Sequence, residues 1–260
     1  MVQKENEGCV EVYVLAPGIR ISFNQINTSS WPKGDNSFFP ERMLTLNFCI
    51  GGRCDVSLAQ NRYAIVKEQQ VCVSTIRPAK DFYYPGKHYY GIQFYLDLSE
   101  LERCGGQDFL TLLGIPLCQL RDIFCGADGL YLHHMNDAML SLVQDTWASR
   151  EELDFGQLRY FMVRLLHELL TMPSESESAA CFTRSQIAIV REAEALILSD
   201  LSKRVTAREM AERFGISESS FKFYVKGILG ESYLAYFRRK RMEKAAAMLE
   251  STNMKVIEIA

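Results

Sequence analysis

The chain has 260 residues, 48% of them hydrophobic and only 7 prolines, which predicts two folded domains and excludes a disordered polypeptide. The formal net charge of −3 argues against a uniformly basic nucleic-acid-binding protein. The charge is uneven, however. Residues 182–260 hold 14 Lys and Arg against 10 Asp and Glu, a balance of +4, whereas residues 1–181 have a balance of −7. This asymmetry suggests that only the C-terminal part meets phosphate.

The start of the chain, MVQKENEGCVEVYV, lacks a basic region followed by an apolar core, so no secretory signal is predicted. No apolar run reaches the ~20 residues that cross a bilayer, so we expect a cytoplasmic protein without a membrane partner. None of the 8 cysteines forms a C-x-x-C pair. We interpret them as small buried hydrophobes in a reducing compartment rather than as metal ligands or disulfides. They are Cys9, Cys49, Cys54, Cys72, Cys104, Cys118, Cys125 and Cys181.

Residues 9–98 contain short runs rich in Val, Ile, Phe and Tyr, separated by turn signals such as Pro17-Gly18, Gly51-Gly52 and Pro85-Gly86. Evenly spaced short strands with such turns predict a barrel or sandwich over residues 1–98.

Residues 99–172 change to helical periodicity, with two helices at about 134–149 and 155–171. One apolar face of each helix should pack on the other helix, and we expect the surplus to form a two-fold dimer contact. The apolar residues of these faces are Met135, Met139, Leu142 and Val143, then Leu158, Phe161, Leu165, Leu166 and Leu169. The serine-rich stretch 173–186 then predicts an exposed linker, and residues 187–260 a helical domain.

The segment VTAREMAERFGISESSFKFYVK, from Val205 to Lys226, has the pattern of a helix-turn-helix. Thr206 and Glu209 form a capping box that starts a helix, and Gly215 can end it in the left-handed conformation. Ser217 caps a second helix, which we expect to run from Glu218 to about Leu229. A steep helix crossing needs a small side chain at the contact, which Ala211 supplies. We expect the shared core to consist of Met210, Phe214, Ile216, Phe221 and Tyr224.

A long helix with a basic middle follows, ESYLAYFRRKRMEKAAAMLES, and the last residues, MKVIEIA, repeat the start of the first motif. The spacing from Val205 to the end resembles the AraC/XylS family of bacterial transcription regulators. The stretches LNFCIGGRCDVSL and HYYGIQFYLDLSEL are similar to the cupin-like sensor domain of such regulators.

This resemblance implies an α+β fold of two domains. A cupin-like β-barrel would bind a small-molecule effector, a helical hairpin would make a homodimer, and an all-α domain would grip promoter DNA. RNA polymerase is a further candidate partner. The chain departs from the family because the second helix-turn-helix is incomplete, so we expect it to be truncated there. It also carries Phe223 where the family often has a long polar residue.

The resemblance places Ser219, Lys222 and Phe223 at base-facing positions and Lys226 near phosphate. Ser217 and Ser220 complete the candidate DNA-binding set, although Ser217 serves as a helix cap with or without DNA. Phe223 cannot hydrogen-bond a base edge but could contact a thymine methyl. The alternative is an ordinary solvated helix face. For Arg241 in the basic helix, contact with DNA and an ion pair within the domain stay equally open.

For the effector, the aromatic residues of the strand region suggest a pocket wall, with core packing as the alternative for each of them. The candidates are Trp31, Phe38, Tyr83, Tyr89 and Phe94.

Cupin enzymes gather two or three histidines with a carboxylate. Of the 4 histidines here, His88, His133, His134 and His167, only His88 lies in the strand region, and His133-His134 is expected to begin a helix. We therefore expect no catalytic residue, metal or cofactor. The sequence predicts a DNA-binding transcription regulator that responds to an effector. The alternative is a cupin-type small-molecule-binding protein whose helical tail mediates protein contacts.

Overall fold

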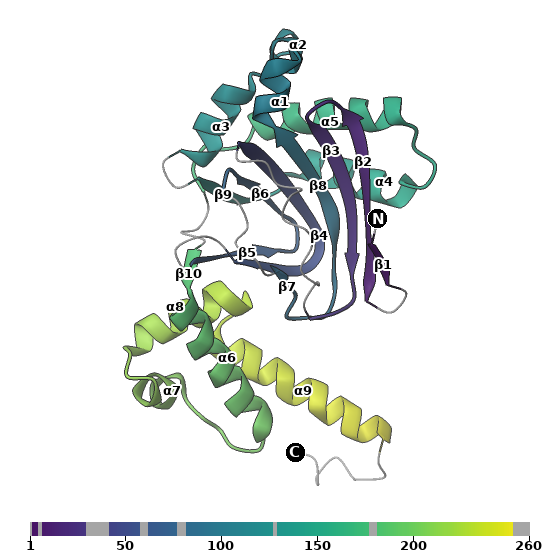
Figure 1. Cartoon of the computed structure of the whole chain (residues 1–260). Coiled ribbons are helices and arrows are strands. Elements are labelled where there is room, and N and C mark those ends of the chain that lie inside the picture. Colours follow the sequence, from purple (N-terminus) through teal and green to yellow (C-terminus); the bar gives the residue numbers. More distant parts are fainter. Residues whose placement is uncertain are drawn as a thin grey trace. The chain divides into compact units, whose positions relative to one another are not determined.

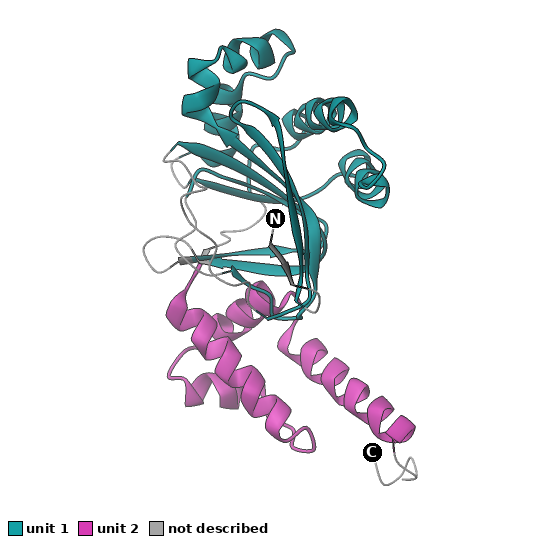
Figure 2. Ribbon diagram, turned by 45° about the vertical axis from the view of Figure 1, so that its right-hand side comes forward, with its two compact units in different colours: residues 1–181 teal, residues 182–260 magenta. Residues whose placement is uncertain are grey.

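The computed structural model describes residues 2–4, 7–29, 42–57, 62–76, 82–126, 129–176 and 181–251. The chain divides into two compact units, residues 1–181 and residues 182–260 (Figure 2). Unit 1 contains nearly all of the strands and a group of helices, and unit 2 is mainly helical.

Unit 1 is built on an antiparallel sheet in which the neighbours run β1-β2-β3-β8-β4 (Figure 1). Strand β4 also pairs with β5, β6 and β7, and β6 pairs with β9. The strands are β1 (Val2–Lys4), β2 (Gly8–Ala16), β3 (Ile19–Ile26), β4 (Met43–Ser57), β5 (Arg62–Lys67), β6 (Gln70–Ser74), β7 (Phe82–Tyr83), β8 (Tyr89–Asp97) and β9 (Leu130–His134).

The pair Gly51-Gly52, predicted as a turn between two strands, lies inside the single long strand β4. The pairing of β4 with β8 shifts in register between Cys49 and Gly51, which indicates a bulge. A side chain at Gly51 would collide with the ring of Tyr90, and Gly52 has a positive φ of 79°. The two glycines therefore permit a close approach and a bend within β4, not a reversal of the chain.

The helices that the structure describes in unit 1 are α1 (Leu98–Arg103), α2 (Gly106–Leu112), α3 (Leu117–Cys125), α4 (Asp137–Ser149) and α5 (Phe155–Leu170). Strand β9 interrupts the segment expected to be wholly helical. His133 and His134 lie in β9, paired with Val71 and Gln70 of β6, and α4 begins only after the Asn136 cap. The prediction that these histidines begin a helix was therefore wrong.

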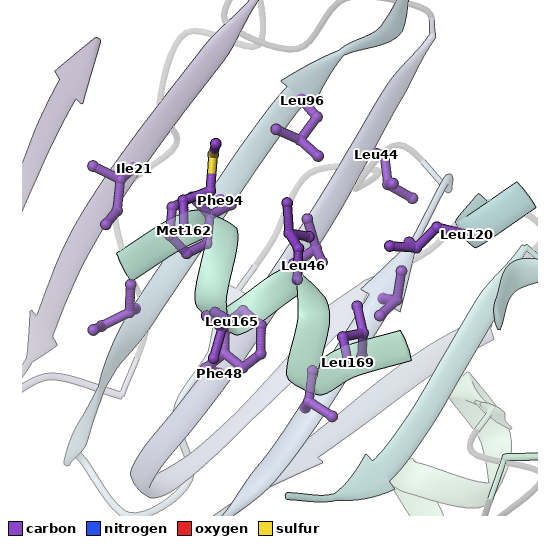
Figure 3. Packing of buried hydrophobic residues seen from close by; sticks show 14 of the residues in the cluster. Ile21, Leu44, Leu46, Phe48, Phe94, Leu96, Leu120, Met162, Leu165 and Leu169 are labelled. Carbon is purple, nitrogen blue, oxygen red and sulfur yellow. The ribbon is translucent and has the colours of Figure 1, made fainter. Parts of the chain in front are cut away.

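The main core lies between the sheet and these helices. From α5, Met162, Leu165 and Leu169 reach toward the strand residues Phe94 and Leu46 (Figure 3). On this helix-covered face the buried residues follow the two-residue period of each strand, for example Leu44, Leu46, Phe48 and Ile50 of β4.

The apolar residues expected to form a dimer contact are used inside unit 1. Met135, Met139, Val143, and all five of the residues named on α5 are buried in the main core, and Leu142 packs against it. The reason is that α4 and α5 cover the sheet, which has a wide apolar face of its own. These side chains are therefore covered within unit 1 itself.

Up to residue 251, the helices of unit 2 are α6 (Arg184–Ser199), α7 (Ala207–Arg213), α8 (Glu218–Leu229) and α9 (Tyr233–Ser251). Strand β10 (Cys181–Thr183) and the first turn of α6 fall within the stretch predicted as a linker. The repeat of the motif in the last residues lies outside the described residues. The predicted fold class is confirmed: an α+β chain with a sheet domain, a helical hairpin and an all-α unit that contains a helix-turn-helix.

Candidate nucleic-acid interface

Helix α7 begins at the predicted capping box. The Thr206 hydroxyl accepts from the Glu209 backbone N–H at 3.2 Å, and the Glu209 carboxylate accepts from the Thr206 backbone N–H at 2.7 Å. Two hydrogen bonds lower the pKa of Glu209: the larger effect comes from the Thr206 backbone N–H and the smaller from the Thr206 hydroxyl. Both bonds satisfy donors that a helix start otherwise leaves unpaired.

The turn after α7 is a Schellman motif. The Gly215 N–H donates to the Glu212 carbonyl at 3.2 Å, and the Ile216 N–H donates to the Ala211 carbonyl at 3.0 Å. Gly215 has a φ of 64°, a conformation that favours glycine. The turn therefore has the geometry that the sequence predicted for a helix-turn-helix.

Helix α8 begins at Ser217, whose hydroxyl accepts from the Ser220 backbone N–H at 3.1 Å. The same hydroxyl donates to the Ser220 hydroxyl at 2.8 Å. Helix α8 ends at Gly230, which has a φ of 89° and whose backbone N–H donates to the Lys226 carbonyl at 3.0 Å. The hydroxyls of Ser217 and Ser220 are thus engaged in hydrogen bonds at the start of α8.

The core of the two helices centres on Phe221, which is fully buried and packs between the rings of Phe214 and Tyr233. Ala211 is buried too, with 1% of its surface exposed. Of the predicted core, Met210 and Phe221 are buried, whereas Phe214, Ile216 and Tyr224 are half-buried. The prediction considered only α7 and α8, and it missed buried residues of α8 and of α6, the helix that supplies the other wall of the core. They are Val225, Ile228, Ile187, Val190, Ala193 and Ile197.

The face of α8 turned away from this core carries Ser219, Lys222, Phe223 and Lys226, which we call the outer face. All four side chains are exposed, and Phe223 keeps 59% of its surface accessible. Lys222 forms an ion pair with Glu218 at 2.6 Å, one turn earlier.

Phe182 supports one flank of the outer face, a role that sequence reasoning did not anticipate. Its ring lies 5.9 Å from that of Phe223, and any side chain at Gly227 would run into it. A glycine in the middle of a helix costs about 1 kcal/mol relative to alanine. The sequence did contain a signal for this contact, namely Gly227, because a glycine in the middle of a helix often marks a place where another residue packs closely against the helix.

Helix α9 is fixed to the rest of unit 2 by two tyrosine hydroxyls. Tyr233 donates to the Val205 carbonyl at 2.9 Å, and Tyr236 donates to the Glu194 carboxylate. Burial, then the bond to Glu194, raises the pKa of Tyr236. These contacts hold α9 against α6 and the start of α7.

The basic middle of α9 is partly neutralised. Arg239 pairs with Glu231 at 2.7 Å and with Glu243, and Lys240 pairs with Glu243 at 2.9 Å. Arg241 lies over the Phe237 ring at 5.9 Å and makes no ion pair with any described residue. Of the two alternatives for Arg241, the structure therefore shows no ion pair within the described part of the domain.

Among the predicted effector residues that the structure describes, Tyr89 and Phe94 do not share one wall. Trp31 and Phe38 lie outside the described residues, and Tyr83 is half-buried on β7. Tyr89 and Phe94 are five residues apart on β8 and so point to opposite faces. Phe94 packs on Phe48 and Phe161 in the main core, which makes it a core residue and not part of a wall shared with Tyr89.

The sheet face opposite the helices carries a row of neutral polar side chains across β3, β8 and β4, which we call the polar band. Its members are Ser22, Asn24, Thr45, Asn47, Gln93 and Tyr95. All except Gln93 are buried. Arg20 lies at the end of the band, paired with Tyr95 in the strand register.

The amides of the polar band are incompletely satisfied. Asn47 Oδ1 accepts from the Tyr89 hydroxyl at 2.7 Å, and Asn24 Nδ2 donates to Gln93 Oε1 at 3.5 Å. Asn47 Nδ2 and Gln93 Nε2 have no partner among the described residues. Buried polar groups are normally hydrogen-bonded, so this band is suited to hold ordered water or a ligand with hydroxyl or amide groups.

No three His, Cys, Asp or Glu side chains gather as a metal site in the part of the chain that the structure describes. Within the same residues, every helix is too short or too polar to span a lipid bilayer.

No protein-family model matches this chain, and no curated protein matches it. Among solved structures, ToxT from Vibrio cholerae aligns at 9% identity and a TM-score of 0.37, over 94% of this chain and 88% of ToxT. The AraC-like transcriptional activator CuxR aligns at 11% identity and a TM-score of 0.37, over 92% of this chain and 80% of CuxR.

An oxalate decarboxylase mutant from Bacillus subtilis aligns at 7% identity and a TM-score of 0.27, over 88% of this chain and 37% of the decarboxylase. Similarities this low do not show a shared function, so the functional argument rests on the residues themselves.

Proposed function

We propose that this chain is a sequence-specific DNA-binding transcription regulator of the AraC type. The observation that carries the proposal is the α7–α8 unit, with its capping box, Schellman turn, buried Ala211 and exposed outer face. A helix-turn-helix of this kind presents its second helix to the major groove. The family resemblance of the sequence leads to the same function.

Within the proposal, the outer face divides into two roles. Ser219, Lys222 and Phe223 lie toward the N-terminal half of α8, the part that meets base edges in such motifs. Lys226, one turn further on, contacts phosphate. Lys222 must leave Glu218 to reach a base, which costs little because exposed ion pairs contribute only ~0–1 kcal/mol.

Phe223 gives the proposal a distinctive signature. A phenyl ring offers no hydrogen bond, but it makes apolar contact with the C5-methyl group of thymine. The site should therefore select thymine at one position, and that selectivity should depend on Phe223.

The test is selection from a random pool of duplex DNA by the full chain, followed by sequencing. We expect a specific enriched motif that contains a preferred thymine, and a loss of that preference in Phe223→Ala. Arg164→Gln, which removes an exposed charge from α5 of unit 1, is the control and should select the same motif. No enrichment by the wild-type chain would contradict the proposal and favour a helical tail that binds protein.

We propose further that the effector binds at the polar band. The middle of the band offers amide and hydroxyl groups and no charge, which suits an uncharged ligand with several hydroxyl or amide groups. Thermal stability should rise with neutral sugars or polyols and should not rise with simple carboxylates. Asn47→Leu should abolish the shift, whereas Phe94→Leu, on the other face of the sheet, should lower stability but keep the shift. A shift that survives in Asn47→Leu would contradict this site.

Homodimerisation, a cytoplasmic location and contact with RNA polymerase remain part of the proposal. Dimeric helix-turn-helix proteins read two half-sites, which multiplies phosphate contacts. Cys49 and Cys54 are buried as small apolar side chains, which suits a reducing compartment, whereas Cys104 and Cys118 are exposed. Light scattering of the full chain tests the dimer, and a monomer at high micromolar concentration would count against it.

A further inference from the structure

Unit 1 contains a half-open apolar cavity that belongs to neither of the sites above. It has a volume of about 310 Å³ and lies between the start of the β2–β3 turn, the α1–α2 elbow and α5. Leu15, Leu101, Leu110 and Val163 contribute to its wall, and Phe109 lies beside them with 60% of its surface exposed. The volume is at the lower end of the range of about 300–1,000 Å³ for small-molecule sites.

The backbone of the elbow helps to keep this cavity open. Gly105, which precedes α2, has a φ of 74°, and a side chain added there would meet no atom within 4 Å. The elbow offsets α2 from α1, and α5 closes the other side. An exposed Phe109 beside an apolar hollow is a surface that a small hydrophobic molecule would cover.

One cation lines the cavity. The Arg159 Nε donates to the Leu15 carbonyl at 2.7 Å, which fixes the guanidinium beside the apolar wall. Arg159 makes no ion pair with any described residue. A guanidinium has five N–H donors, so four are left for a ligand, in the forked geometry that matches a carboxylate.

We propose that this cavity binds a small monocarboxylic acid with an apolar body. The carboxylate pairs with the free N–H groups of Arg159, and the apolar body lies against Leu101, Leu110 and Val163. The inference goes beyond the proposed function and does not depend on DNA binding or on the polar band. A neutral apolar molecule would use the wall alone and bind more weakly.

The test is isothermal titration of the full chain with octanoate, and with octanol as the uncharged match. We expect octanoate to bind about tenfold more tightly than octanol, because charge-assisted hydrogen bonds to a fixed guanidinium form only with the acid. From butanoate to octanoate, affinity should rise by about fourfold per methylene, as follows from about 0.8 kcal/mol per buried CH₂.

Arg159→Gln should bring octanoate down to the affinity of octanol, and Val163→Trp should fill the cavity and abolish binding of both. Arg164 is an exposed arginine five residues after Arg159 on α5, and it lies outside the cavity wall. Arg164→Gln is therefore the matched control and should bind octanoate like the wild type. Far-UV circular dichroism verifies that the variants fold, and Arg159→Gln keeps the test valid if Val163→Trp does not. Absence of octanoate binding at millimolar concentration, or equal binding by Arg159→Gln, would overturn the proposal.

Discussion

Ala211→Leu is the substitution that most directly challenges the helix-turn-helix geometry. Ala211 has 1% of its surface exposed, and it lies on α7 where α8 packs. Adding three carbons at a filled position forces neighbouring side chains or backbone to move, which costs about 1–3 kcal/mol. Unit 2 has about 80 residues, a size at which each kcal/mol lowers Tm by about 4–8 °C. We therefore expect its Tm to fall by about 5–20 °C.

The positions of the tryptophans make it possible to assign this loss of stability to unit 2. Both tryptophans of the sequence, Trp31 and Trp147, belong to unit 1. Tryptophan fluorescence should therefore report an unchanged unfolding of unit 1, while circular dichroism at 222 nm should show the earlier loss of helix. Ala246→Leu, at an exposed position on α9, is the control and should leave both signals within about 0.5 kcal/mol of the wild type. A Tm unchanged in Ala211→Leu would refute the tight crossing.

Three further predictions concern caps and charges in unit 2. Ser217→Ala removes the hydroxyl that caps α8 and should cost about 1 kcal/mol in urea unfolding; an unchanged midpoint would contradict the cap. Gly230→Ala forces a side chain into the left-handed conformation and should cost about 1 kcal/mol in the same assay, whereas a neutral effect would mean that α8 does not end there as described. The Ser202 hydroxyl and then Lys203 lower the pKa of Asp200 from 3.8 to about 2, so their contribution to stability is present above pH 3.8 and lost as the pH falls toward 2. In an NMR titration Ser202→Ala should raise this pKa, and an unchanged pKa would exclude the hydroxyl as its main cause.

The helix-turn-helix could be predicted closely because its signals are local. Thr206 with Glu209, Gly215, Ser217 and Gly230 each act on backbone groups within a few residues, so their effect does not depend on the rest of the fold. The predicted bounds of α8 agree with the structure for the same reason. Phe182 was missed because it contacts Phe223 from a distant part of the sequence.

Unit 1 shows what a single sequence does not contain. Gly51-Gly52 is a turn signal in isolation, and only the approach of Tyr90 shows that the pair lies inside a strand. His133-His134 precedes a helical pattern, but pairing with Val71 of β6 draws it into a strand. Local propensity yields in both cases to tertiary contacts.

The dimer and the effector site stay predictions, and a single sequence limits each of them for a different reason. The apolar periodicity of α5 shows that its inner face is covered, but not whether a sheet or a second chain covers it. The sheet covers it here. By contrast, the opposite orientation of Tyr89 and Phe94 follows from their odd spacing on one strand and could have been predicted. The polar band, too, follows the alternation of β3, β4 and β8.

The most direct measurement of the central claim is the affinity of the full chain for its enriched DNA across a salt series, by fluorescence anisotropy. We predict that log Kd varies linearly with log salt, and that Lys226→Gln reduces the slope by about one, as expected for the loss of one phosphate contact. Phe223→Ala should weaken binding without changing the slope, because Phe223 contacts a base and no phosphate. Wild-type affinity and slope in both variants would contradict the account of α8 as the DNA-reading helix.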